Sequence, residues 1–524
     1  MSLLTRVNDA VTDQRTPRRG LVLAIVCLAA LIINVDNTIL NVALPTLVLD
    51  LHATSSQLQW IVDSYAMVFA GLLLVGGTLA DRFGRKRFFL IGMTVFALGS
   101  IGAALSGSVT TLIAFRAIMG AGAALTIPTS LAIINDIFRD PGERARAIGA
   151  WGGTIGLGIA IGPIAGGLLL SRFWWGSIFL VNVPIACIAF LGAALVVPDS
   201  KNPHVDRPDP VGAVLSIAGL GLLLWAIIEG PTRGWASGAV AGAGVASLMV
   251  LGSFVLWESR STHPMLKLGF FRHRRFSVAL AAECLGVSGL MGALFLSTQF
   301  LQFDLGYSPL QAGLRILPIA LMVIVGAAIS PVAARLAGVK LTVGAALVSI
   351  AAGLWQVAST SRFDTTYGDV VLGLLLIGLG AGLMLPTATN SVIGSVPQED
   401  SGMGSATNTV ALQVGGALGI AVMGSVMLTR YQSHMAAALV GRRVPASVAQ
   451  TIFGSLGAAM AVAAHVGGST GDQLARAART AFMSGNEVAL TVGATVALAA
   501  ALLVFIALPS KAPSVPPSPT EPGE

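Results

Sequence analysis

Long apolar runs recur along almost the whole chain and limit its fold more than any other feature. A run of about twenty apolar residues can cross the hydrocarbon core of a bilayer as an α-helix, in which the backbone satisfies its own hydrogen bonds. Counting these runs predicts fourteen transmembrane helices. We place them near residues 21–43, 57–80, 88–107, 110–132, 146–170, 174–197, 211–229, 237–257, 276–300, 310–333, 338–357, 369–392, 406–428 and 487–508.

The composition excludes a soluble protein and offers no catalytic centre. Of the 524 residues, 55% are hydrophobic and 10% charged, whereas about a quarter are charged in soluble domains. The three cysteines lie inside apolar runs, and the chain has neither a phosphate-binding loop nor a histidine pair at metal-ligand spacing. We therefore predict an all-α polytopic membrane protein that is not an enzyme, needs no cofactor or metal, and binds no nucleic acid.

Basic residues are distributed unequally between alternate loops. With the N-terminus in the cytoplasm, most of the 31 lysines and arginines fall in cytoplasmic segments, as the positive-inside rule requires. We predict a plasma-membrane protein with both termini cytoplasmic.

The predicted spans divide as six, two and six. This division gives two helical bundles separated by a linker with two added spans. The segments are a cytoplasmic N-terminus 1–20, a first bundle 21–198, a linker 199–275, a second bundle 276–508 that includes an extracellular helical hairpin at 429–486, and a disordered cytoplasmic tail 509–524.

A charged turn separates the second and third apolar runs. Its four basic side chains, between residues 82 and 87, cannot rest in hydrocarbon, so the turn lies at a water interface. Gly77 would let two helices approach closely, Gly84 would allow a tight turn, and Asp81 would pair with a neighbouring arginine. We predict a breakable conformational latch made by Gly77, Asp81, Arg82, Gly84 and Arg85.

Four of the ionisable residues within apolar runs are candidates for function, because a charge is costly there and usually functional. We predict that Asp36 and Asp63 share one solvated cavity and exchange protons or a cationic substrate there. Arg116 is a candidate counter-charge, although a structural ion pair would explain it equally well. Glu283 either faces the cavity or is a hydrogen-bonded group inside the bundle.

Several motifs resemble those of one transporter family. The stretch Gly77-x-x-x-Asp-Arg-x-Gly-Arg-Lys-Arg87 resembles the loop between spans 2 and 3 of the major facilitator superfamily. Val35–Pro45 is similar to the first-span signature of its 14-span drug:proton antiporters, and Trp60–Tyr65 to the branch that exports quaternary ammonium compounds. The resemblance implies two six-helix bundles around a central cavity.

A glycine-rich stretch in the fifth run resembles the antiporter motif of drug exporters. Glycines four residues apart allow close helix contact, and a proline bends the helix. Packing and hinge roles are predicted for Gly158, Gly162, Pro163, Gly166 and Gly167.

Aromatic residues near the two acids could stack on a lipophilic cation. The candidates for the cavity wall are Trp60, Tyr65 and Phe69.

The resemblance implies a monomeric proton-coupled antiporter, driven by the proton gradient, that exports lipophilic cations such as quaternary ammonium and dye-like compounds by alternating access. A lipid, siderophore or endogenous metabolite is an alternative cargo, with drug efflux incidental. A non-transporting sensor is a third interpretation, against which the retained Asp36 and Asp63 argue.

Overall fold

The computed structural model describes residues 16–201, 208–262, 264–361, 365–397, 400–442 and 444–509, and all regular secondary structure in them is helical. The all-α fold class is therefore confirmed. The predicted tail and most of the N-terminal segment lie outside the described residues.

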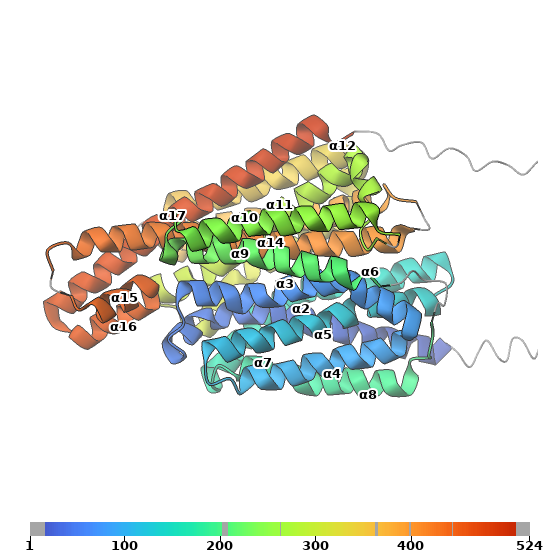
Figure 1. Ribbon diagram of the computed structural model, residues 1–524, viewed down its shortest axis with the longest axis horizontal. Helices are drawn as coiled ribbons and strands as arrows, with labels where there is room; N and C mark the ends of the chain where they lie inside the picture. The colour runs from blue at the N-terminus through green and yellow to red at the C-terminus, as the bar shows by residue number, and fades with distance from the viewer. Residues whose placement is uncertain are drawn as a thin grey trace, which may run out of the picture.

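The first bundle contains six spans, the last of them in two pieces (Figure 1). Local sequence sets their starts: Thr54 and Ser108 form capping boxes, and the Asp140 side chain accepts a hydrogen bond from the Glu143 backbone N–H. The helices are α2 (Thr16–Asp50), α3 (Ser55–Phe83), α4 (Arg85–Ala104), α5 (Val109–Ile137), α6 (Pro141–Arg172), α7 (Ser177–Leu180) and α8 (Asn182–Val196).

Two added helices precede the second bundle. α9 (Pro210–Arg233) packs against α3 of the first bundle and α14 of the second, so it covers the seam between them, while α10 (Gly238–Arg260) packs mainly on α9. A short 3-10 turn, η1 (Leu268–Arg272), follows.

The second bundle contains α11 (Arg274–Gln299), the π-helical turn η2 (Phe300–Asp304), α12 (Pro309–Thr360), α13 (Tyr367–Ile393), α14 (Ser401–Leu439), α15 (Ala446–Gly454), α16 (Leu456–Val466) and α17 (Gly468–Ala507).

Thirteen helices of the described chain are long and apolar enough to cross a membrane, and one of them accounts for two predicted spans. α12 has 52 residues, but Gly338 inside it has a φ of 82° and a ψ of 158°, which no α-helix contains. Two helices therefore meet at this glycine without a loop. The predicted tenth and eleventh spans are the two parts of α12.

The described part of the segment 429–486 is mostly helical and projects from one end of the molecule, where α15 and α16 lie beside the ends of α14 and α17 (Figure 1). The Tyr431 hydroxyl is buried and donates a hydrogen bond to the Ile452 carbonyl at 2.8 Å. Gly457 on α16 packs against Val48 and Phe303, one from each bundle. That this end is extracellular stays a prediction.

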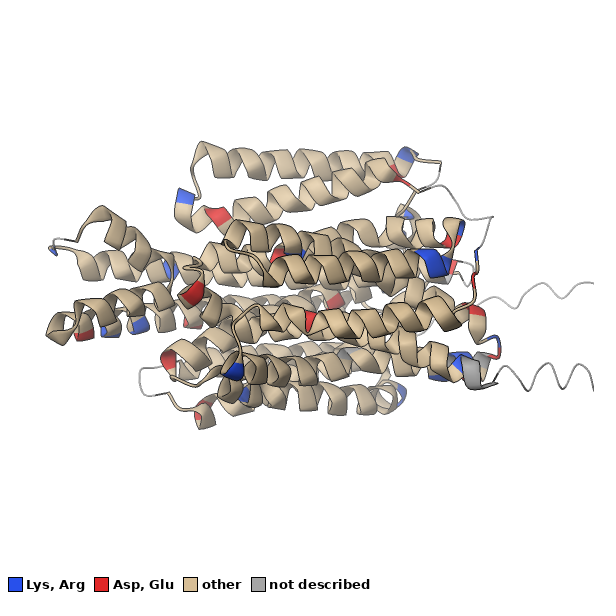
Figure 2. Cartoon of the chain, turned by 90° about the horizontal axis from the view of Figure 1, so that it is seen from below, with Lys and Arg blue, Asp and Glu red and all other residues tan. Residues whose placement is uncertain are grey.

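Charged residues gather at the two ends of the molecule and leave a long central band almost free of charge (Figure 2). We call the end that carries the loop between α3 and α4 the basic end, and the end that carries α15 and α16 the opposite end.

Candidate functional site

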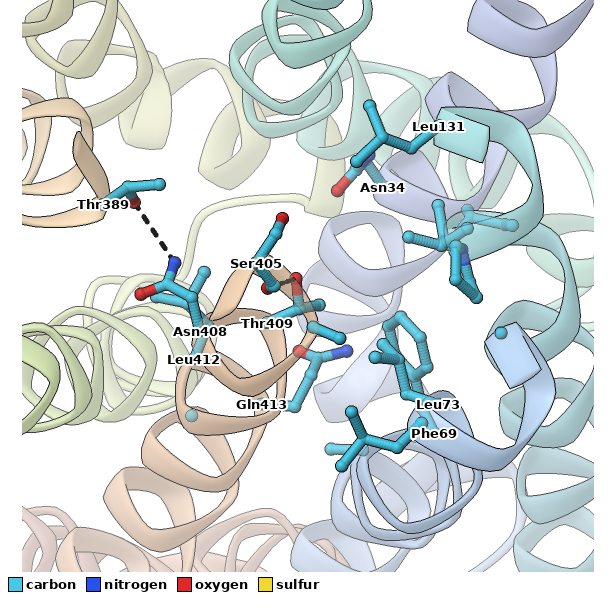
Figure 3. A pocket seen from close by; sticks show the side chains of 18 of the residues that line it. Asn34, Phe69, Leu73, Leu131, Thr389, Ser405, Asn408, Thr409, Leu412 and Gln413 are labelled. Atoms are coloured by element: carbon cyan, nitrogen blue, oxygen red, sulfur yellow. Dashed lines mark hydrogen bonds between the residues drawn. The ribbon is translucent and has the colours of Figure 1, made fainter. Parts of the chain in front are cut away.

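A cavity of about 780 Å³ lies between the two bundles. Its walls come from α2, α3, α5 and α6 on one side and from α11, α13 and α14 on the other (Figure 3). The lining reaches Asp81, Arg85 and Asp400, which lie at the basic end. The cavity therefore opens toward that end.

Contacts between the bundles close the opposite half. A methyl group added at Gly167 on α6 would come within 2.5 Å of Leu310 Cα on α12, so these helices touch along their backbones. Gln302 Nε2 donates a hydrogen bond to the Val42 carbonyl at 2.9 Å. The cavity is therefore open at the basic end and closed at the opposite end.

Asp36 and Arg116 form a buried ion pair within the first bundle. Arg116 Nη1 lies 2.5 Å from Asp36 Oδ2, and both side chains are at most 1% exposed. Asn182 Nδ2 on α8 donates to the other oxygen of Asp36 at 2.7 Å. Arg116 also donates from Nε to the Ile61 carbonyl and lies 4.5 Å from the centre of the Tyr65 ring. Four helices therefore converge on this one pair.

The predicted shared cavity for Asp36 and Asp63 is wrong for this conformation. Neither residue lines the cavity, because each lies on a helix face turned into the bundle. Asp63 is fully buried, and no described residue makes a hydrogen bond to either of its carboxylate oxygens. Burial without a partner distinguishes Asp63 from Asp36.

Glu283 lies directly behind the cavity wall of the second bundle. Thr389 Oγ1 donates to Glu283 Oε1 at 2.5 Å, and Asn408 Nδ2 approaches the same oxygen at 3.4 Å. Thr389 and Asn408 line the cavity, whereas Glu283 is fully buried (Figure 3). Of the two predicted alternatives, the structure has the hydrogen-bonded group inside the bundle.

Arg85 holds the charged turn at the basic end together. Its Nε donates to Asp81 Oδ1 at 2.7 Å, and its Nη1 lies 3.5 Å from Asp136 Oδ1 on α5. Gly84 has a φ of 119°, so the tight turn requires a glycine, as predicted. Arg82 stacks on the neighbouring Phe83 ring. The side-chain partners of Arg85 all belong to the first bundle, and its backbone N–H donates to the Ser200 carbonyl in the linker at 2.9 Å, so in this conformation Arg85 does not join the two bundles.

The close helix approach predicted for Gly77 occurs one residue earlier. A methyl group at Gly76 would come within 2.6 Å of the Ala124 carbonyl oxygen on α5, while one at Gly77 would lie 3.5 Å from Pro128 Cβ, an ordinary contact. Gly77 instead faces the cavity. The packing role predicted for Gly77 was therefore wrong, because the helix face could not be read from the motif alone, while its part in the latch stays a prediction.

Glycines of α6 form a stripe that packs on α2. A methyl group at Gly158 would come within 2.6 Å of Asn34 Cβ, one at Gly162 within 2.9 Å of the Ile39 nitrogen, and one at Gly166 within 3.0 Å of the Ile39 carbonyl oxygen. The carbonyl of Pro163 contacts Gly313 on α12. These residues thus hold one helix of each bundle against α6.

Only one of the three predicted aromatics lines the cavity. Phe69 does, together with Trp151 from α6. Tyr65 is fully buried against Arg116, and Trp60 packs on the cluster between α9 and α14, so placing these two in the cavity was wrong. The face of α3 that carries Tyr65 points into the first bundle, and the face that carries Trp60 points toward the added helix α9.

Sequence reasoning gave no role to Asn182 or Thr389, although both touch a buried acid. Asn182 is a polar residue within the apolar run 174–197, so its polarity was an available signal. Thr389 carries no such signal, because threonines are common in membrane helices, where their hydroxyls bond to the backbone.

Comparisons with known proteins agree with this geometry. Residues 26–420 match the Major Facilitator Superfamily. The chain is 36% identical to "Multidrug efflux pump LfrA" of Mycolicibacterium smegmatis, covering 96% of this chain and 99% of that one. It is 32% identical to the "Tetracenomycin C resistance and export protein" of Streptomyces glaucescens, over 94% and 93% of the two chains.

A third relative and a solved structure extend the likeness. The chain is 31% identical to "Methyl viologen resistance protein SmvA" of Salmonella typhimurium, over 94% of this chain and 98% of that one. A crystal structure of a bacterial homolog of the human lysosomal transporter Spinster, inward-facing and occupied, superposes with a TM-score of 0.64 at 15% identity, over 94% and 97% of the chains.

Proposed function

Because this chain belongs to the major facilitator superfamily, we propose that it is a proton-coupled antiporter that exports amphipathic, lipophilic cations across the plasma membrane. Members of this family are multi-pass membrane proteins that move solutes by secondary transport and are not enzymes. The relatives named for multidrug efflux and for methyl viologen resistance support a drug-like cationic cargo. Both termini would be cytoplasmic, and the protein would act as a monomer.

The observation that carries the proposal is the buried Asp63, which has no partner among the described residues. An ionised carboxylate without a partner is costly to bury. Asp63 would therefore carry a proton in this conformation, whereas Asp36 is paired with Arg116. Two acids in one bundle, one paired with an arginine and one without a partner, would give the transporter one site for a proton and one with a counter-charge.

The proposed cycle alternates the side on which the cavity opens. With the basic end in the cytoplasm, this conformation loads cargo from the cell, beside Phe69 and Trp151. Rocking of the bundles would separate the contacts near Gly167 and Gln302, close the basic end, and expose Asp63 to protons from outside. Glu283 would serve as a second proton site in the other bundle. The proton gradient takes the place of a cofactor.

The charged turn would act in the closed state of the basic end. Asp81 and Arg85 line the cavity mouth, and the ion pairs of their side chains stay within their own bundle here. Closure of the mouth would bring them against the second bundle, where they would latch that state.

An endogenous metabolite is a second candidate cargo, supported by the relative named for tetracenomycin C export. A metabolite would use the same cavity and the same proton cycle, so only the proposed substrate would differ and the proposed mechanism would stay the same.

Ethidium transport by the purified protein in proteoliposomes with an imposed proton gradient tests the proposal. We expect transport that a protonophore abolishes and that Asp63→Asn and Asp36→Asn reduce at least tenfold. Asp50→Asn is the matched control, because Asp50 lies on the same helix as Asp36 but is exposed. Gradient-independent transport, or full activity in Asp63→Asn, would contradict proton coupling through these acids, and no transport of ethidium would move the search to metabolites.

A further inference from the structure

Two polar side chains of α3 are buried about one helical turn apart, and each leaves atoms without a partner. Gln59 and Asp63 are both 0% exposed. No described residue accepts a hydrogen bond from Gln59 Nε2, and none donates one to either carboxylate oxygen of Asp63. A spacing of four residues places both side chains on one face of the helix. An unused donor and two unused acceptors are therefore neighbours on α3.

A contact with the second bundle occupies the Gln59 amide. The Ser425 hydroxyl on α14 donates to Gln59 Oε1 at 3.3 Å. A methyl group added at Gly424 would come within 2.8 Å of both Cδ and Nε2 of Gln59, so the amide packs directly on α14. α3 begins at the opposite end and α14 runs toward it, so this contact lies in the half of the molecule where the bundles are closed (Figure 1).

The charged side chains on the helices that pack against α3 do not bond to Asp63. Arg116 on α5 and Asp36 on α2 pair with each other, and Glu229 on α9 pairs with Arg233. The other described groups on α3 and these helices that carry a charge near neutral pH are exposed or lie toward helix ends: Arg19, Asp50, Asp81, Arg82, Arg85, Lys86, Arg87, Asp136, Arg430 and His434. Gln59 Nε2 is therefore the uncommitted donor on the face of α3 that carries Asp63.

We propose that Gln59 is a positioning residue that couples the proton on Asp63 to the opening of the opposite end. While Asp63 carries a proton, the Gln59 amide stays with Ser425 and that end is closed. When the bundles separate there, Gln59 loses Ser425, and its Nε2 donates to the ionised carboxylate of Asp63. Glutamine and aspartate four residues apart make such bonds on helices, and a charged acceptor strengthens them. The inference rests on the proposed proton role of Asp63 and adds the link between that proton and the movement.

This exchange of partners orders the transport cycle. An ionised Asp63 holds Gln59 and favours the open opposite end, where protons from outside reach it. Protonation of Asp63 releases the amide to Ser425 and favours closure. A molecule that has not taken up a proton is thereby hindered from returning to the conformation described here, as coupled exchange requires.

The pH at which the opposite end opens tests the coupling. Spin labels on Gly107→Cys, after α4, and Ser359→Cys, near the end of α12, would sit on different bundles at that end, and both positions are exposed. Double electron–electron resonance would measure the distance between the labels across a range of pH, on the full-length protein in nanodiscs with its three native cysteines replaced by alanine. We expect the distance to increase as pH rises, and Asp63→Asn to abolish this dependence.

Two substitutions separate coupling from simple packing. Gln59→Met keeps the length of the side chain but removes the amide. The open state then loses a hydrogen bond to a charged acceptor and the closed state only a neutral one, so the midpoint of opening should rise by about one pH unit. Ser425→Ala removes a partner from the closed state alone and should lower the midpoint. If Gln59 only held the bundles together, both variants would lower it.

A control and a second variant guard the comparison. Ser433→Ala should leave the midpoint unchanged, because the exposed Ser433 hydroxyl donates to the Arg430 carbonyl of its own helix. Gln59→Leu also lacks the amide and must show the same upward shift as Gln59→Met, so the result does not depend on how well one variant folds.

The outcomes distinguish this inference from the function on which it rests. An opening that ignores pH, or a pH dependence that survives in Asp63→Asn, overturns proton coupling through Asp63 and the role of Gln59 with it. A dependence on Asp63 whose midpoint is unchanged or lowered in the Gln59 variants overturns the role of Gln59 alone. A midpoint that rises in Ser425→Ala overturns the exchange of partners.

Discussion

The carboxylate of Asp36 and the guanidinium of Arg116 meet 2.5 Å apart, each almost completely buried, although the two residues are 80 positions apart in the sequence. Removing one member of such a pair leaves the other charge buried alone, which typically costs about 3–5 kcal/mol, whereas removing both costs less. We expect Arg116→Gln to destabilise the detergent-purified protein strongly, and Asp36→Asn with Arg116→Gln to recover part of that loss in thermal unfolding. Strictly additive losses would argue that the two residues act independently.

The stripe of small residues on α6 predicts a position-dependent alanine series. Gly162→Ala forces the new methyl group to within 2.9 Å of the Ile39 nitrogen, and such overpacking costs about 1–3 kcal/mol. Gly153→Ala, on the same helix with no atom within 4 Å, should be neutral or slightly stabilising. Thermal unfolding and ethidium transport should both separate the two variants, and equal behaviour would rule out the close packing of α6 on α2.

Gly76 and Gly77 make a second matched pair. Gly76→Ala should destabilise the protein, because the methyl group would meet the Ala124 carbonyl oxygen at 2.6 Å. Gly77→Ala should leave the unfolding temperature unchanged, since its nearest neighbour would be at an ordinary distance. The reverse order of stabilities would mean that the face of α3 has been assigned wrongly.

Arg85 should matter for transport more than for stability. Lysine cannot replace its bridge, because Arg85 uses separate nitrogens for Asp81 and Asp136. The acids are about a third exposed, so the pairs contribute little to stability, typically about 0–1 kcal/mol. We expect Arg85→Lys to unfold near the temperature of the unmodified protein but to transport ethidium several times more slowly. A folded variant with normal transport would remove Arg85 from the latch.

Thr389 controls how Glu283 is held behind the cavity wall. Thr389→Val keeps the side-chain shape but removes a donor from a buried carboxyl group, which should cost about 1–3 kcal/mol. Thr491→Val is the control, because that hydroxyl bonds to the carbonyl of Glu487 on its own exposed helix turn. Thermal unfolding in detergent compares the two, and the hydrogen bond to Glu283 would be unimportant if they behaved alike.

Much of the fold was accessible from the sequence because the bilayer demands long apolar helices and basic turns. The two-part α12 was foreseen as two spans, since residues 333–340 interrupt the apolar pattern with charge. The site was less accessible. Motifs identified Asp36, Asp63 and Arg116 as unusual, but which face of a helix looks into a cavity depends on how neighbouring helices rotate, and an apolar run that is hydrophobic on all sides does not reveal this.

The same limit explains the misplaced aromatics. Tyr65 and Phe69 are four residues apart and their rings meet edge to face at 5.9 Å, yet one covers Arg116 and the other borders the cavity. A rotation of one helix by a fraction of a turn decides between these surroundings. Packing of α3 against α5, α14 and α9 fixes that rotation.

The lengths of α14 and α17 offer a way to follow the opening and closing of the cavity. Helices of 39 and 40 residues extend roughly 60 Å, about twice the hydrocarbon thickness of a bilayer, and their far ends stand clear of the bundles (Figure 1). When the second bundle tilts, these tips would move farther than any residue inside the bundle. A pair of fluorophores, one at a tip and one on the short turn after α4, would register each opening and closing of a single molecule as a change in energy transfer.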